Sequence, residues 1–187
     1  MTPISVTAAT LPTDMKPLCE IYRESFFLER TADGQAFLSL VRPLLRHPAV
    51  HILSTYRHHI GTHRLQHAIS VAYLSYHICR DRGLSVEEAC RAALLHDLFY
   101  FDRTRGDAPR LPWLRHPAIA WENARGLYPF TALGEDIICR HMWPLTRSLP
   151  RTKEGRIVSF ADKYCAMREF FHAFRPTSYI RRKDTRP

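Results

Sequence analysis

The sequence has 187 residues, of which 45% are hydrophobic, and this size and composition suit one globular domain with a large buried core. No apolar run approaches the roughly 18 residues of a membrane-spanning helix, and the opening stretch MTPISVTAATLPTDMK lacks the apolar core of a signal peptide. We therefore expect a soluble, cytoplasmic protein without a membrane partner. The 27 Lys and Arg residues exceed the 18 Asp and Glu residues, which gives a net charge of +9.

The excess positive charge is concentrated in two segments. Residues 103–115 carry four cations and one anion, and residues 175–187 carry five cations and one anion. We interpret 175–187 as a solvated basic tail, with contact to nucleic acid or a membrane as the less favoured alternative. The segment 103–115 is either a phosphate-binding loop, because Arg side chains suit phosphate oxygens, or an ordinary surface loop.

The hydrophobic period along most of the chain is helical, which predicts an all-α, compact, single-domain helical bundle. Residues 14–30 and 34–46 are predicted as two helices of an N-terminal extension, residues 1–57, that packs on the core. The second helix should kink at Pro43 and end at His47, because a residue before a proline avoids the α conformation.

The next predicted helix has Thr62 as its N-terminal cap and ends at Gly83. Arg64 and His67 lie on the same face of this helix as three apolar residues, Val71, Leu74 and Ile78. This spacing places both polar side chains on the inward side, where each needs a partner. Considered alone, His67 is more simply a hydrogen-bonded core histidine than a metal ligand.

A further helix is predicted to open with a capping box formed by Ser85 and Glu88 and to run to His96 and Asp97. Neighbouring helix residues point about 100° apart, so these last two side chains can converge on a metal ion only at the edge of the helix. A carboxylate at a helix C-terminus opposes the helix dipole, and a bound cation would reverse this penalty. His96 and Asp97 are therefore candidate metal ligands.

Three more candidate ligands follow. His116 precedes Pro117, which predicts that His116 lies at the cap of a helix through residues 118–124, and His141 ends the segment LGEDIICRH. Each of these histidines alone suits an ordinary capping or surface position. Asp162 lies on the inward stripe of a last helix, residues 153–174, where a buried carboxylate costs several kcal/mol unless it is paired or bound to a metal.

Six N and O ligands thus lie on five helical segments, and bundles build metal sites from the inward residues of facing helices. The order H…HD…H…H…D resembles that of the HD-domain superfamily of metal-dependent phosphohydrolases over about residues 58–170. The stretches HRLQH, CRAALLHDLFYFD, RHMWPL and ADKYCA are especially similar to those of a bacterial subgroup of HD-domain hydrolases. The resemblance implies an HD metal-binding domain over residues 58–174, preceded by the extension and followed by the basic tail.

The resemblance also implies two divalent transition metals. The first would be held by four residues, His67, His96, Asp97 and Asp162. Asp97 would bridge to a second metal held by His116 and His141. Imidazole and carboxylate ligands suit Fe, Mn, Co, Ni or Zn better than Mg, and Fe or Mn is expected first. The GYP signature is absent, which argues against cyclic di-GMP as the substrate.

The implied activity is hydrolysis of a phosphate ester or anhydride, especially of a nucleotide, by a metal-bridging hydroxide. The partner would be a small anionic phosphorylated substrate. Asp97, Arg64 and Lys163 are the candidate catalytic residues, although Arg64 or Lys163 could instead form a structural ion pair with Asp162. The alternative function is a metal-stabilised module that senses a nucleotide or docks nucleic acid without turnover. The sequence leaves the substrate and the oligomeric state open.

Other polar residues flank these motifs. Asp102 is predicted to be an exposed loop aspartate, with the orientation of the attacking water or of a leaving group as its alternative role. His58, His59 and His63 cluster before His67, and His63, one helical turn away, is a candidate to support it.

Overall fold

The computed structural model describes residues 17–25, 31–58, 62–102, 106 and 108–173. These residues form helices and no β-strand, which confirms the predicted all-α fold. No helix in this part of the chain has the length and apolar character needed to cross a membrane. The elements are α1 (Leu18–Glu24), α2 (Ala32–Leu45), α3 (Pro48–His51), the 3-10 helix η2 (Ile52–Thr55), α4 (Arg64–Asp81), α5 (Val86–Leu95), α6 (Pro112–Ala124), α7 (Ala132–Arg140) and α8 (Lys153–Ala173).

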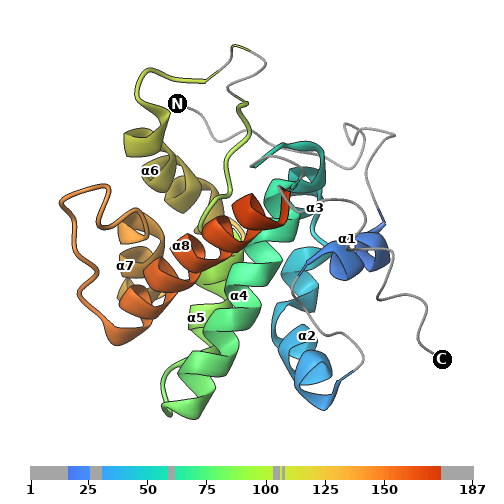
Figure 1. The fold of residues 1–187 in the computed structure, drawn as a ribbon. Coiled ribbons are helices and arrows are strands. Elements are labelled where there is room, and N and C mark those ends of the chain that lie inside the picture. The colour runs from blue at the N-terminus through green and yellow to red at the C-terminus, as the bar shows by residue number, and fades with distance from the viewer. Residues whose placement is uncertain (1–16, 26–30, 59–61, 103–105, 107, 174–187) are drawn as a thin grey trace.

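Helices α4, α5 and α8 form the centre of the bundle (Figure 1). Helix α4 packs along α5 and is crossed by α8. Helix α7 packs against both α5 and α8, and α6 packs against α7. The N-terminal helices complete the same body, because α2 packs against α5, and α1 and η2 pack against α4.

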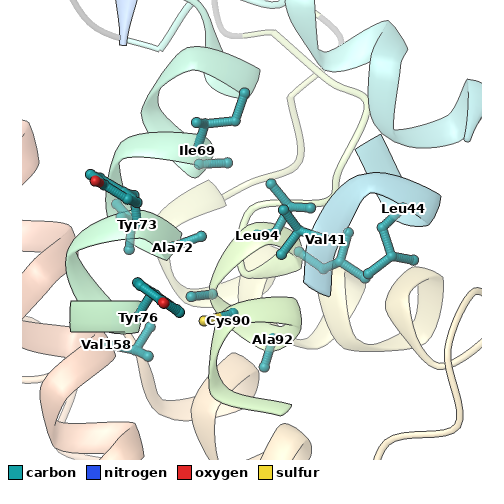
Figure 2. Close-up of a cluster of buried hydrophobic side chains, with 14 of the residues drawn as sticks. Val41, Leu44, Ile69, Ala72, Tyr73, Tyr76, Cys90, Ala92, Leu94 and Val158 are labelled. Carbon is teal, nitrogen blue, oxygen red and sulfur yellow. The ribbon is translucent and has the colours of Figure 1, made fainter. Parts of the chain in front are cut away.

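One hydrophobic cluster joins the N-terminal helices to the centre. Val41 of α2 packs there with Ile69 of α4 and Leu94 of α5 (Figure 2). Phe37 of α2 is fully buried, and its ring lies edge-on to that of Tyr73 with a centroid distance of 5.2 Å. Since 13 of the 18 residues of α4 are buried, polar residues in its first turns are enclosed by neighbouring helices.

The N-terminal helices differ from the predicted ones at their ends. Helix α1 covers 7 residues of the predicted 14–30, and residues 14–16 and 26–30 lie outside the described residues. Helix α2 contains Pro43 and ends at Leu45, close to the predicted end. A new short helix begins at Pro48, because proline suits a first helical position and Nδ1 of His47 accepts a hydrogen bond from the Ala49 N–H at 3.2 Å.

The predicted N-terminal cap of α4 is wrong by one residue. The cap residue is His63, and the Thr62 hydroxyl instead donates a hydrogen bond of 3.5 Å to Glu169 of α8. The predicted end is close, because α4 stops at Asp81 and Gly83 adopts a left-handed φ of 62°.

The predicted capping box of α5 is also wrong, because Ser85 makes no side-chain cap bond. Its N–H donates to Glu154 at 3.1 Å, and Glu88 accepts a hydrogen bond of 2.7 Å from the N–H of Thr131. Both carboxylates therefore link α5 to other helices, and tertiary contacts replace the local bonds that the pattern favours.

Candidate metal centre

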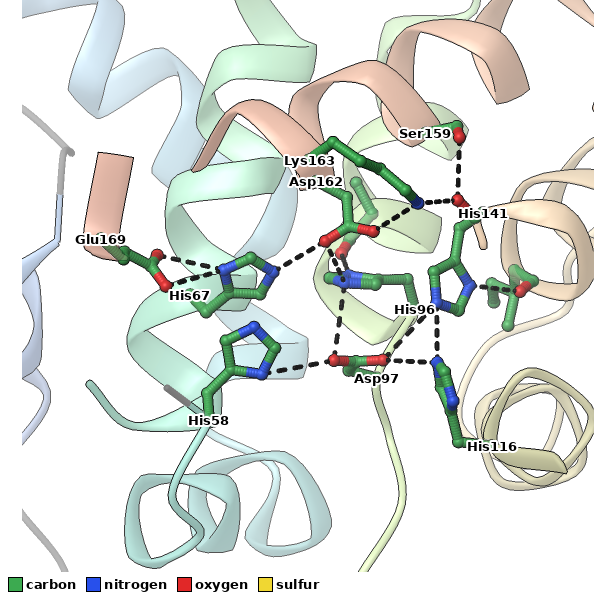
Figure 3. A network of polar contacts seen from close by, with 12 residues as sticks. His58, His67, His96, Asp97, His116, His141, Ser159, Asp162, Lys163 and Glu169 are labelled. Atoms are coloured by element: carbon green, nitrogen blue, oxygen red, sulfur yellow. Dashed lines mark hydrogen bonds and ion pairs between the residues drawn. The ribbon is translucent and has the colours of Figure 1, made fainter. Parts of the chain in front are cut away.

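Five helical elements bring the six predicted ligands into one buried cluster (Figure 3). Each ligand lies in or directly after one of these helices: His67 in the first turns of α4, His96 and Asp97 after α5, His116 in α6, His141 after α7 and Asp162 in α8. Helices that contact one another in the fold thus place distant residues side by side.

His116 does not lie at a helix cap, contrary to the prediction. Helix α6 begins at Pro112, so His116 is in its second turn and Pro117 lies inside the helix. Pro112 takes the early position that proline favours, directly after Leu111, which has a left-handed φ of 56°. The His116 side chain reaches the cluster nevertheless, with Nε2 at 3.2 Å from Oδ1 of Asp97.

The Asp97 carboxylate is the centre of the cluster. Its Oδ1 lies 3.2 Å from Nε2 of His116 and 3.6 Å from Nε2 of His141. Its Oδ2 lies 3.8 Å from Nε2 of His96 and 3.7 Å from Nδ1 of His58. The two oxygens therefore face two different sets of histidines, as a bridging carboxylate would.

The fully buried His67 ring lies between two carboxylates of α8. Its Nε2 is 3.1 Å from Oδ1 of Asp162, and its Nδ1 is 3.0 and 3.1 Å from the two oxygens of Glu169. The same Oδ1 of Asp162 lies 3.8 Å from Nε2 of His96. The His58 ring stacks on His67 with a centroid distance of 3.8 Å.

The other three histidine ligands share one orientation, in which Nδ1 faces a backbone carbonyl oxygen. The pairs are His96 with Ala93 at 2.7 Å, His116 with Pro112 at 3.1 Å and His141 with Ile138 at 2.7 Å. A carbonyl can only accept a hydrogen bond, so Nδ1 carries the proton and the neutral ring presents a lone pair on Nε2. All three Nε2 atoms point into the cluster, which is the arrangement of metal-binding histidines.

Charge keeps the two aspartates ionised. Burial raises the pKa of Asp97, but its electrostatic interactions with His96, His116 and His141 outweigh burial and hold this pKa well below its usual value. Burial likewise opposes ionisation of Asp162, whose pKa is held low by the hydrogen bond to His67 and by electrostatic interactions with His96 and the Lys163 ammonium. Both groups are therefore carboxylates at neutral pH.

The pKa values of two histidines in the cluster are shifted in opposite directions. Burial, reinforced by electrostatic interactions with His96 and His116, lowers the pKa of His141 to about 3. Burial also disfavours protonation of His67, but hydrogen bonds to Asp162 and Glu169 overcome it and raise the pKa of His67 to about 10. Without a metal, His67 thus holds a proton between carboxylates, whereas His141 is neutral and can bind a cation.

The cluster fits a divalent transition metal. Nε2 of His96 and Oδ1 of Asp97 are buried and make no hydrogen bond to the described residues. Three overlapping groups bring their ligand atoms within 4.8 Å of one another, namely His67 with His96 and Asp162, His96 with Asp97 and His141, and His58 with His67 and Asp97. Imidazole nitrogen and carboxylate oxygen form the donor set of Fe, Mn, Co, Ni and Zn sites.

A pocket of about 490 Å³ opens onto this cluster. Four predicted ligands line it, and its other walls are largely apolar, with Phe99, Phe101, Pro112, Trp113, Met142 and Leu145. Asp102 also lines the pocket and is 6% exposed, so the prediction of an exposed aspartate is wrong. The volume of the pocket is that of a small-molecule site.

Arg64 lines the pocket, but its guanidinium donates hydrogen bonds to the backbone that follows Asp97. Nη1 donates to the carbonyl of Phe99 at 2.6 Å, and Nη2 donates to the carbonyl of Phe101 at 3.2 Å. The guanidinium carbon also lies 3.7 Å from the centroid of the Phe99 ring. Arg64 therefore fixes the position of the segment between Asp97 and Asp102.

Lys163 forms the ion pair with Asp162 that the sequence left as an alternative. Its Nζ lies 2.9 Å from Oδ2 of Asp162 and also donates to the carbonyl oxygen of His141. Its side chain is 31% exposed and lines the pocket, so the ammonium is accessible from the site.

Two members of the cluster were not assigned from the sequence. His58 was noted only as one of a group of histidines, and the signal for Glu169 was its position seven residues after Asp162, two turns along the same face of α8. His63, the predicted supporting residue, is instead the cap residue of α4, and His59 lies outside the described residues.

One of the two basic segments, 103–115, lies partly at the pocket. Within 103–115, Pro112 and Trp113 line the pocket, whereas Arg110 and Arg115 are exposed. Residues 103–105, 107 and the tail 175–187 lie outside the described residues.

Comparison with known families agrees with the geometry. The sequence pattern of the HD domain matches residues 64–167, more than half of the chain and a range that contains all six predicted ligands. No curated protein and no solved structure matches the chain significantly. The chain belongs to the HD-domain superfamily of metal-dependent phosphohydrolases.

Proposed function

We propose that the protein hydrolyses a small phosphate ester or anhydride and that its substrate is a nucleotide. The reaction would use two divalent transition metal ions, and Fe and Mn are the preferred candidates. The observation that carries the proposal is the cluster of six buried ligands at a pocket of about 490 Å³. The pocket has the size of a small-molecule site, and its aromatic walls suit a base while its cations suit a phosphate.

In this proposal His67, His96, Asp97 and Asp162 hold one ion, and Asp97, His116 and His141 hold the other. When bound, such ions turn water into hydroxide near neutral pH and neutralise phosphoryl oxygens. Asp97 contributes one oxygen to each half of the site, which supports its bridging role.

The cations of the pocket take different roles. Lys163 holds Asp162 in place and, being partly exposed to the pocket, can also contact a phosphoryl oxygen. Arg57 is exposed at the same pocket and adds a positive charge for an anionic substrate. Arg64 positions the Phe99–Phe101 backbone, and its contact with a phosphate stays a prediction.

The proposal is tested by metal-dependent turnover. Metal-free protein is reconstituted with Mn²⁺ or, without oxygen, with Fe²⁺, and phosphate release is followed over nucleoside mono-, di- and triphosphates, dinucleotides and an aryl phosphate. We expect turnover that disappears with chelator and in Asp97→Asn. Tight nucleotide binding without turnover in every metal form would instead support the sensing module, and neither binding nor turnover would contradict both functions.

A further inference from the structure

Glu169 contacts a candidate metal-binding histidine, His67, through both of its carboxylate oxygens. Both of its carboxylate oxygens lie within 3.1 Å of Nδ1 of His67, and Glu169 is 3% exposed. The Thr62 hydroxyl donates to one of these oxygens at 3.5 Å. Among the described residues, no Lys or Arg forms an ion pair with this carboxylate.

The position of Glu169 on α8 explains the contact. Asp162 and Glu169 are two helical turns apart on one face, so a single rigid helix presents one carboxylate to each nitrogen of the His67 ring. The ring is thereby held in one plane and one direction between them (Figure 3).

We infer that Glu169 is a positioning residue of the metal centre, which fixes the proton of His67 on Nδ1 and so commits Nε2 to the metal. This inference rests on the metal-dependent function proposed above. A carboxylate that accepts the Nδ1 proton also makes the imidazole a stronger donor at Nε2, and loss of such a partner commonly weakens metal binding by about 10- to 100-fold. At Nδ1, His96, His116 and His141 face neutral backbone carbonyls, whereas His67 faces the Glu169 carboxylate.

The test is a titration of the metal-free protein with Co²⁺, followed by visible absorption and by calorimetry. Glu169→Gln retains an acceptor oxygen but loses the charge, and we expect one of two Co²⁺ ions to bind about 10- to 100-fold more weakly, with a changed spectrum. The ion at His116 and His141 should bind as in the wild type. Glu169→Asp restores the charge on a shorter side chain and should recover part of the lost affinity.

Glu154→Gln is the matched control, since Glu154 lies in the first turn of the same helix, accepts a hydrogen bond from the Ser85 N–H and does not belong to the cluster. It should bind both ions as the wild type does. If Glu169→Gln and Glu169→Asp keep wild-type affinities and spectra and lose only thermal stability, Glu169 is a structural residue and the inference is wrong. A wild type that takes up no Co²⁺, Mn²⁺ or Fe²⁺ would overturn the proposed function as well.

Discussion

Nε2 of His116 and Nε2 of His141 lie 2.9 Å apart, although Nδ1 of each ring already faces a backbone carbonyl. Two neutral rings in this tautomer would direct lone pairs at each other, which is repulsive unless a proton or a metal ion lies beside both. The low pKa of His141, about 3, disfavours the proton on that ring. The pair, with Oδ1 of Asp97 close to both, is therefore best satisfied by a cation.

Metal content should reflect the two halves of the cluster. We expect about two ions per wild-type chain after reconstitution, and about one in His141→Ala, because four ligands of the other half remain. Elemental analysis of desalted protein measures the ratio. A wild type that retains a single ion would exclude the dinuclear arrangement and leave a mononuclear one.

Asp97→Asn should abolish hydrolysis while leaving the helical fold. The amide retains the shape of the carboxylate but removes the charge shared between the two halves, so we expect kcat to fall by roughly a thousandfold or more, as several kcal/mol of transition-state stabilisation depend on the metals. Steady-state kinetics and circular dichroism check the two parts. Turnover close to the wild-type rate would show that Asp97 does not bridge.

The pKa of His67 predicts that rising pH lowers the stability of the metal-free protein and raises its affinity for metal. In the metal-free form this pKa rises from 6.5 to about 10, so His67 contributes stability that is fully present below pH 6.5 and is lost as pH rises through about 10. A metal at Nε2 must displace this proton, so metal affinity should rise about tenfold per pH unit between about pH 7 and 9.

Chemical denaturation of the metal-free protein and competition titrations with a chelator measure the two effects across that pH range. Metal affinity that does not change with pH would show that His67 binds without losing a proton.

Arg64→Lys separates the structural role of this residue from phosphate binding. Lysine offers one nitrogen in place of the two that donate separately to the Phe99 and Phe101 carbonyls, so we expect a loss of about 1–3 kcal/mol in stability and a melting temperature lower by roughly 2–4 °C for each kcal/mol. If the guanidinium also contacts phosphate, kcat/KM should fall by roughly one to three powers of ten at unchanged metal content. An unchanged melting temperature would contradict the structural role.

The helices could be predicted from the spacing of their inward-facing residues, but their end residues were harder to predict. The inward spacing of Arg64 and His67 on α4 gave their burial correctly, since helical period and burial follow the same geometry. The caps at Thr62 and Ser85 failed because Glu169 and Glu154, about 107 and 69 residues away, offer tertiary partners that no local pattern contains.

The sequence allowed the six candidate ligands to be predicted, but not most of the residues and backbone groups that contact them. His96 and Asp97 stand out because a histidine and a carboxylate at a helix end need a cation. The partners of Arg64 are backbone carbonyls, which have no sequence signature, so its anchoring of Phe99 and Phe101 required the structure. His58 reaches Asp97 only because of the path that the chain takes before α4.

The contact between His67 and Asp162 joins residues 95 positions apart in the chain. A metal held by both would close a loop of that length, and such a cross-link restricts the unfolded chain in the manner of a disulfide. During synthesis α8 follows all the other ligand-bearing helices, so the first half-site can be completed only after this helix has left the ribosome. Any chain ended before α8 lacks both carboxylates that hold His67, and metal capture therefore reports on completion of the fold.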